Sequence, residues 1–130
     1  MQSVSTMLRC LIVEDHGDTR AGYAEYLEVC GIQAWTAADA EELRERLQKD
    51  LPDAIVLDLQ LPRTDGWQLM RELKGDARTR QIPIIVVSAC VMPAERAAAL
   101  EGGCDAFLMK PVDPAEIVEA IHRCVGIADG

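Results

Sequence analysis

Five short apolar segments recur along the chain, and each is followed by residues spaced as in an amphipathic helix. Such an alternation indicates βαβ units, and therefore a parallel sheet with helices on both of its faces. The pattern predicts an α/β fold of the (βα)5 type, built on a doubly wound five-stranded parallel sheet. The predicted strands are Leu8 to Val13, Gln33 to Thr36, Ala54 to Leu57, Ile82 to Val87 and Ala106 to Met109.

The composition of the strands predicts their order in the sheet. The first, third and fourth are nearly continuous runs of Ile, Val and Leu, as expected for strands that are covered on both faces. The second strand is more polar, which favours a place at an edge. Since crossovers are right-handed, the flavodoxin-like order 2-1-3-4-5 fits best, because it puts this weak strand at an edge.

The predicted helices carry signals at their ends. Asp39 can cap the second helix, and Asp113 followed by Pro114 can start the fifth. Ala97 and Leu100 mark a short fourth helix that ends at Gly102 and Gly103. No linker or repeat separates these elements, so residues 1–130 are expected to form one domain, with residues 1–7 as an N-terminal tail.

Charge and composition exclude several classes of function. A net charge of −9 argues against a nucleic-acid-binding surface. No apolar run approaches the roughly 20 residues that would span a bilayer, and no signal peptide is visible. The five cysteines form no C-x-x-C pair, and we expect them to be reduced and mostly buried. These features predict a cytoplasmic protein that binds neither membrane nor nucleic acid directly.

Polar residues follow four of the five predicted strands. Glu14 and Asp15 end the first, Asp58 the third, Ser88 the fourth and Lys110 the fifth. The carboxyl ends of parallel strands meet at one edge of the sheet, where ligands bind in such folds. We therefore expect these five side chains to lie together.

Three carboxylates brought together need more than a single lysine to neutralise them. Each pair repels by about 4 kcal/mol at ~4 Å and an effective dielectric constant near 20. A hard divalent cation with oxygen ligands resolves this repulsion, and Mg²⁺ suits a site with few protein ligands. A carboxylate, Mg²⁺, a lysine and a hydroxyl together are suited to phosphoryl transfer.

The chain resembles the receiver domain of two-component response regulators from about Leu8 to Ile127. The matching stretches are LIVEDH, IVLDLQLPRTDGWQL, IIVVSACVMPAERAAALEGGCDAFLMKP and the closing helix. The resemblance implies that Asp58 is the phosphoacceptor. Asp15 would then bind Mg²⁺ directly, Glu14 would act on the metal through water, and the backbone carbonyl of Gln60 would complete the protein ligands together with Asp58.

The resemblance also implies roles at the other strand ends. Ser88 and Lys110 would bind the phosphoryl oxygens, and Phe107 would turn inward as Ser88 closes on the phosphoryl group. The bond from Lys110 to Pro111 would be cis. The output face would comprise the fourth helix, fifth strand and fifth helix, at Val91 to Leu100, Cys104 to Met109 and Ile117 to Val125.

The function expected from the resemblance is that of a signalling switch. A sensor histidine kinase or a histidine phosphotransfer protein would donate the phosphoryl group to Asp58. The output face would then bind a downstream protein or a second copy of the chain. Such a switch is no enzyme beyond its own phosphorylation and dephosphorylation.

Three other functions are less consistent with the residues. A phosphatase of the haloacid dehalogenase type needs a second Asp two residues after its nucleophile, where this chain has Gln60. A flavin or nucleotide binder needs Gly, Ser and Thr in the first loop, which reads EDHGDTR. The alternative that keeps the fold is a phosphorylation-independent docking module, a pseudo-receiver. His16 lies beside the acids, but no second histidine has ligand spacing, so we expect no metal role for it.

Overall fold

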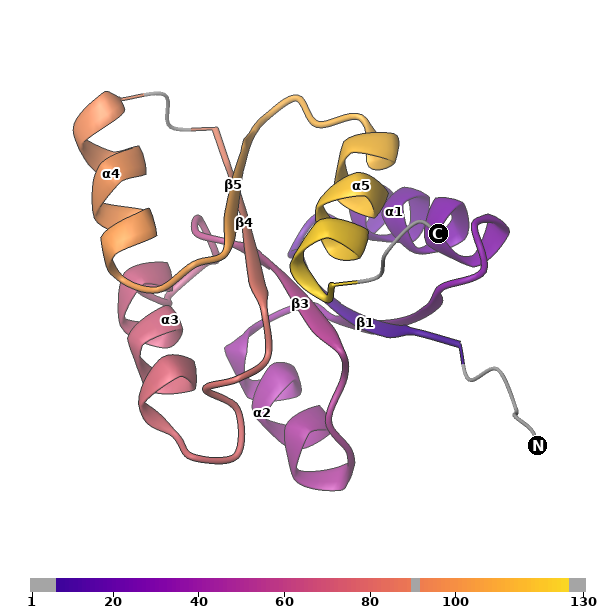
Figure 1. Ribbon diagram of the computed structural model, residues 1–130, viewed down its shortest axis with the longest axis horizontal. Helices are drawn as coiled ribbons and strands as arrows, with labels where there is room; N and C mark the ends of the chain where they lie inside the picture. Colours follow the sequence, from indigo (N-terminus) through magenta and orange to yellow (C-terminus); the bar gives the residue numbers. More distant parts are fainter. Residues whose placement is uncertain (1–6, 90–91, 127–130) are drawn as a thin grey trace.

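The computed structural model describes residues 7–89 and 92–126, and within them it has the predicted (βα)5 architecture (Figure 1). The strands are β1 (Arg9–Val13), β2 (Gln33–Ala37), β3 (Ala54–Asp58), β4 (Ile84–Ser88) and β5 (Ala106–Met109). The helices are α1 (Gly17–Val29), α2 (Ala40–Lys49), α3 (Gly66–Gly75), α4 (Pro93–Glu101) and α5 (Pro114–Cys124).

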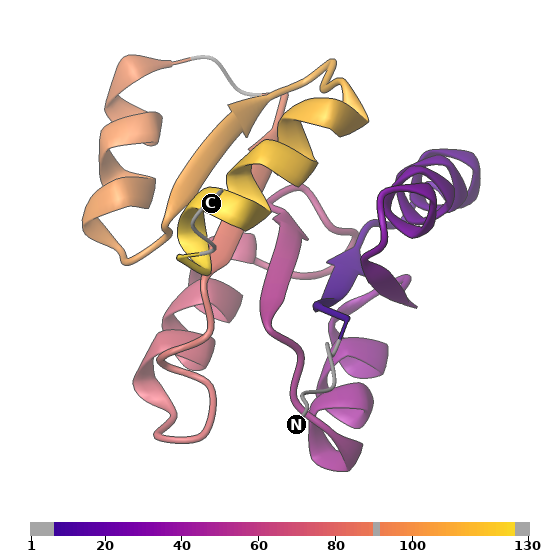
Figure 2. The same ribbon diagram turned by 45° about the vertical axis from the view of Figure 1, so that its right-hand side comes forward.

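All neighbouring strands pair in parallel, in the order β2-β1-β3-β4-β5, which confirms the predicted topology. Helices α1 and α5 cover one face of the sheet, and α2, α3 and α4 lie on the other (Figures 1 and 2). A separate apolar core lies on each side. Every residue of β3 and β4 is buried, as their continuous apolar sequences predicted.

Strand β2 lies at an edge, as its polar sequence predicted, and is only partly buried. Its Trp35 ring packs between two guanidinium groups, with the Arg9 carbon 5.3 Å and the Arg46 carbon 5.9 Å from the ring centre. These cation–π contacts cover an aromatic ring that the edge position would otherwise leave open to water.

Four of the five strands differ from their predicted bounds by one or two residues, and the packing of one helix also differs from the prediction. Strand β4 begins at Ile84 rather than at Ile82, because the Ile82 N–H closes a turn on the carbonyl of Thr79 and Pro83 has no N–H to donate. Helix α4 forms as predicted, but neither residue that marked it is buried. Its buried residue is Ala99, and Leu100 is 48% exposed.

The four cysteines among the described residues are free. Cys10 and Cys104 are buried, and burial raises the pKa of these thiols to about 12 and about 11, so both are protonated at neutral pH. Cys124 is half-buried, but Cys30 is exposed, so the prediction of buried cysteines is wrong there. Cys90 and Val91 lie outside the described residues, as do residues 1–6 of the predicted tail. Within the described ranges, no helix has the length and apolar character to cross a bilayer.

Candidate functional site

The predicted site residues gather at the carboxyl edge of the sheet. Asp58 and Ser88 are the last residues of β3 and β4, Glu14 and Asp15 follow β1 directly, and Lys110 follows β5. The backbone N–H of Lys110 donates to the carbonyl of Ser88 at 2.9 Å, which fixes the end of β5 against β4. Parallel topology alone brings these residues together from positions far apart in the sequence.

Asp58 is 2% exposed, and both of its carboxylate oxygens have partners. Oδ1 accepts a hydrogen bond of 2.8 Å from the backbone N–H of Gln60. Oδ2 accepts one of 2.9 Å from Nζ of Lys110. An acid buried at the end of an apolar strand is therefore balanced by the ammonium of the residue that follows β5.

Glu14 is 1% exposed and shares the same lysine. Its Oε1 lies 3.3 Å from Nζ of Lys110, so the ammonium bridges the acids that follow β1 and end β3. Burial by itself lowers the pKa of Lys110, but the hydrogen bonds and negative charges of Asp58 and Glu14 outweigh it. The pKa of Lys110 is therefore raised, and the side chain carries its charge throughout the neutral range.

Asp15 is the acid whose partners are incomplete. Its Oδ1 is buried and has no hydrogen-bond partner among the described residues. A buried carboxylate oxygen without a donor is costly, and a cation removes that cost. With three carboxylates and one ammonium, the donor set of this site fits a hard divalent cation.

His16 is the residue that the sequence analysis set aside. Its backbone N–H donates to Oε2 of Glu14 at 3.0 Å, and its Nδ1 lies 3.1 Å from the same oxygen and 3.5 Å from Oδ1 of Asp15. Ligand atoms of these three residues lie within 4.8 Å of one another. The ring itself is mostly exposed, with 72% of the side chain accessible.

The loop after β3 depends on a glycine. A Cβ at Gly66 would lie 2.5 Å from the carbonyl oxygen of Leu59, so a larger residue would push the loop away from the strand. Asp65 caps α3 next to it, accepting hydrogen bonds from the N–H groups of Trp67 and Gln68. The Asp65-Gly66 pair therefore fixes the path of the segment that carries Gln60.

The remaining predicted features of the site lie on and after β4 and β5. Phe107 is half-buried, lies opposite Val86 in the pairing of β4 with β5, and packs on the core beneath α2, α3 and α4. The Lys110–Pro111 peptide bond is cis, as predicted. Ser88, the last residue of β4, is 1% exposed.

Arg20 belongs to this region, and the sequence analysis missed it. It lies in the second turn of α1, and its Nη1 donates to the carbonyl oxygens of Glu14 at 2.8 Å and Asp15 at 3.4 Å. Side-chain spacing does not indicate this contact, because Arg20 binds the backbone carbonyls of Glu14 and Asp15 rather than their carboxylates.

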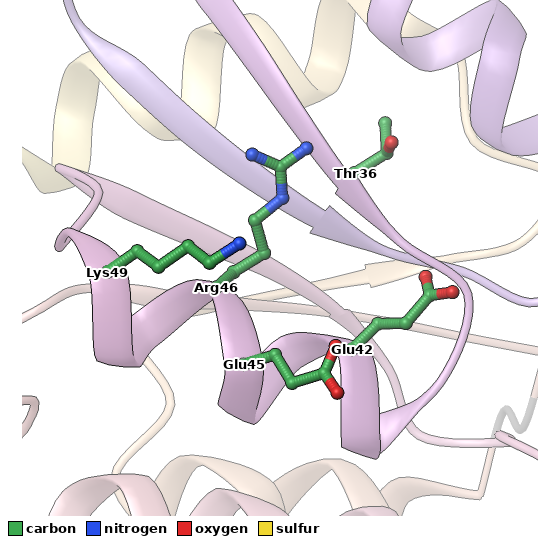
Figure 3. Close-up of a pocket in the computed structure, with 5 residues that line it drawn as sticks. All are labelled: Thr36, Glu42, Glu45, Arg46 and Lys49. Atoms are coloured by element: carbon green, nitrogen blue, oxygen red, sulfur yellow. The ribbon is translucent and has the colours of Figure 1, made fainter.

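A hollow of about 520 Å³ lies elsewhere, between α2 and the edge strand β2 (Figure 3). It is lined by Thr36, Glu42, Glu45, Arg46 and Lys49. None of the clustered acids lines it, and its two cations and two carboxylates balance. The chemistry of the molecule is therefore concentrated at the carboxyl edge of the sheet rather than in this hollow.

Comparison with known proteins agrees with this geometry. The family model described as "Response regulator receiver domain" matches residues 10–122. Response regulator Rre1 of Synechocystis is 38% identical over 114 residues, which are 87% of this chain and 49% of that protein. The polar-differentiation response regulator DivK of Brucella anthropi is 30% identical over 118 residues, 91% of this chain and 96% of that protein. The chain thus spans about half the length of one curated relative and nearly all of the other.

Solved structures show the same fold. A sensor protein from Polaromonas is 31% identical with a TM-score of 0.84, over 92% of this chain and 96% of that one. The receiver domain of sensor histidine kinase PA1611 from Pseudomonas aeruginosa is 27% identical with a TM-score of 0.82, over 93% and 99%. The latter is described with a magnesium ion coordinated in its active-site cleft.

Proposed function

The chain belongs to the family of response regulator receiver domains, which are phosphorylation-activated signalling switches, and we propose that Asp58 is the residue on which this switch accepts its phosphoryl group. The observation that carries the proposal is the placement of Asp58. Its carboxylate is buried, yet it is hydrogen-bonded to Lys110 and lies beside a second buried acid, Glu14. A carboxylate that only ended a strand would need none of this surrounding chemistry.

The reaction that we assign to these residues is an in-line displacement. A carboxylate oxygen of Asp58 attacks the phosphorus of a phosphohistidine donor, the new O–P bond forms as the P–N bond breaks, and the donor imidazole leaves with the bonding electrons. Lys110 stabilises charge on the phosphoryl oxygens, and the Ser88 hydroxyl donates to one of them. Its own phosphorylation and dephosphorylation are the only chemistry that we assign to the chain.

We further propose that the site works with Mg²⁺. Asp15 and Asp58 would bind it directly, the backbone carbonyl of Gln60 would complete the protein ligands, and Glu14 would act through a water molecule. The unpartnered Oδ1 of Asp15 and the excess of acid over lysine support this assignment. When bound, the cation supplies charge neutralisation between the attacking carboxylate and the phosphoryl group.

The partners follow from the same scheme. The donor would be a sensor histidine kinase or a histidine phosphotransfer protein. The output would pass through the α4-β5-α5 face to a downstream protein or a second copy of the chain. Three exposed apolar side chains support this choice: Met92, which precedes α4, is 58% exposed, and Leu100 of α4 and Met109 of β5 are each 48% exposed. We take residues 1–130 as one receiver domain. A phosphorylation-independent docking module is not favoured, since the full set of acids, hydroxyl and lysine is present.

The proposal is tested with a small phosphodonor. Incubation with acetyl phosphate and Mg²⁺ should add the mass of one phosphoryl group, in a linkage that is stable in acid and cleaved by hydroxylamine. Asp58→Asn should take up no label, whereas Asp50→Asn, at the far end of α2, should be labelled like the wild type. Label retained in Asp58→Asn would move the phosphoacceptor elsewhere. A wild type that takes no label would favour the pseudo-receiver.

A further inference from the structure

Arg20 contacts Glu14 and Asp15, the acid pair that follows β1, through their backbone and not through their carboxylates. Its guanidinium Nη1 donates to the backbone carbonyl of Glu14 at 2.8 Å, and more weakly to that of Asp15 at 3.4 Å. The backbone N–H of Arg20 donates to the carbonyl of His16 at 2.9 Å, so the residue is itself fixed within the first turns of α1. A side chain of α1 is thereby hydrogen-bonded to the segment that connects β1 with α1.

The segment between β1 and α1 is held on both sides of Glu14. The N–H of Glu14 donates to the carbonyl of Ala37, the last residue of β2, at 3.1 Å. Its carbonyl accepts from Arg20. With the peptide groups on both sides fixed, the directions in which the Glu14 and Asp15 side chains leave the backbone are fixed too.

Arg20 does this without occupying a carboxylate oxygen. Among the ion pairs of the described residues, none joins Arg20 to an acid, although two buried or half-buried acids lie next to the carbonyls that it binds. The oxygens of Glu14 are bound by Lys110 and His16, and Oδ1 of Asp15 is left without a hydrogen-bond donor.

We infer that Arg20 is a positioning residue for the divalent cation: it orients the two acids through their backbone carbonyls and does not itself bind their carboxylate oxygens, of which Oδ1 of Asp15 has no hydrogen-bond partner. This inference rests on the proposed Mg²⁺ site, but assigns a role to a residue outside the ligand set. Removing a group that hydrogen-bonds to a metal-binding residue typically lowers the metal affinity by about 10- to 100-fold.

Two effects of removing Arg20 have opposite signs, and this makes the inference testable. Loss of a positive charge near a cation site strengthens attraction for Mg²⁺, so charge alone predicts tighter binding. Loss of the hydrogen bonds to the carbonyls frees the acid pair, so positioning predicts weaker binding. The sign of the change therefore decides between them.

The experiment is a Mg²⁺ titration of the whole chain, followed by amide shifts of Asp15 and Gln60. We expect Arg20→Gln to weaken Mg²⁺ binding by about tenfold, at the low end of the range for such groups. Arg20→Lys should recover part of the affinity, because an ammonium can still donate to a carbonyl. Arg44→Gln is the matched control: it removes the same charge from a surface pair with Glu72 and should leave the affinity within about twofold of the wild type.

The outcomes separate this inference from the proposed function. A wild type that binds no Mg²⁺ would refute the metal site itself. A wild type that binds, with Arg20→Gln equal or tighter, would overturn only the role of Arg20, as would a lysine variant without any recovery. Thermal unfolding without Mg²⁺ shows whether each variant is folded. If Arg20→Gln is not, Arg20→Met, which keeps the apolar stem, is titrated with the same two outcomes.

Discussion

Helices α3 and α4 follow the two strands that end on Asp58 and Ser88, yet the structure holds them in very different ways. Helix α3 buries Leu69, Met70 and Leu73, each no more than 3% exposed. Helix α4 buries Ala99 alone, and its Leu100 is half exposed. In Figure 1, α3 and α4 lie next to each other on the same side of the sheet, so the difference in their burial is not one of face.

The cap residues and ion pairs of the two helices also hold α3 more firmly than α4. Asp65 caps α3 with its side chain, whereas Met92 begins α4 and offers no side-chain cap. Helix α3 is also tied to its neighbours by ion pairs, from Glu72 to Arg44 of α2 at 2.9 Å and from Lys74 to Asp105 at 3.2 Å. The Lys74 ammonium adds hydrogen bonds to the carbonyls that precede β4.

The difference in packing allows one part of the site to keep a fixed geometry while a neighbouring helix is free to move. The acid that we propose as phosphoacceptor is carried on the firmly packed side, so its geometry is preserved. The hydroxyl that we propose as its partner is followed by a helix with little buried apolar area. A coupling free energy of about 1–3 kcal/mol is the usual size for such switches. We expect α4, which buries only Ala99, to respond to a coupling of that size.

The largest effect on the free energy of unfolding is expected when a buried leucine of α3 is truncated, and the same truncation on α4 serves as the comparison. Leu69→Ala removes a side chain that is 1% exposed and should lower the free energy of unfolding by about 2–5 kcal/mol. Leu100→Ala, half exposed on α4, should cost less than about 1 kcal/mol. Urea unfolding of both variants measures the difference. Equal losses would mean that α4 is anchored as firmly as α3, and the comparison would fail.

A smaller effect is expected at the helix caps. Asp65→Ala should cost about 1 kcal/mol, because two N–H groups at the start of α3 lose their acceptor. Met92→Ser should gain roughly 0.5–1 kcal/mol, since it places a hydroxyl at an extended N-cap residue whose own side chain makes no cap hydrogen bond. Thermal unfolding of the two variants should shift in opposite directions. A Met92→Ser variant with no gain would show that the start of α4 is already satisfied.

Much of this arrangement could be predicted from the sequence. Continuous apolar runs identified the doubly covered strands, a polar second strand identified the edge, and parallel topology then brought Asp58, Ser88 and Lys110 to one rim. The exposed side of α4 could not be predicted, because Ala97 and Ala98 give no contrast between its faces. The hydrogen bonds of Arg20 to the carbonyls of Glu14 and Asp15 could not be predicted either, because they depend on a long side chain that folds back over the start of its own helix.

The contacts of His16 were missed for a related reason. A metal-binding histidine is usually sought by its spacing from a second histidine. The His16 ring instead contacts the carboxylates of Glu14 and Asp15, because the turn before α1 places it next to them. Phe107 remains a prediction as the residue that turns inward when Ser88 closes on the phosphoryl group.

The measurement that tests the central claim most directly is a comparison of amide shifts with and without beryllofluoride, a mimic of the phosphoryl group, in the presence of Mg²⁺. We expect large shifts for the loop around Asp58 and for α4 and β5, with the residues of α3 beyond its first turn changing little. Asp58→Asn should show none of these changes. Shifts confined to the Asp58 loop, with α4 and β5 silent, would contradict the proposal that the loosely held helix carries the signal.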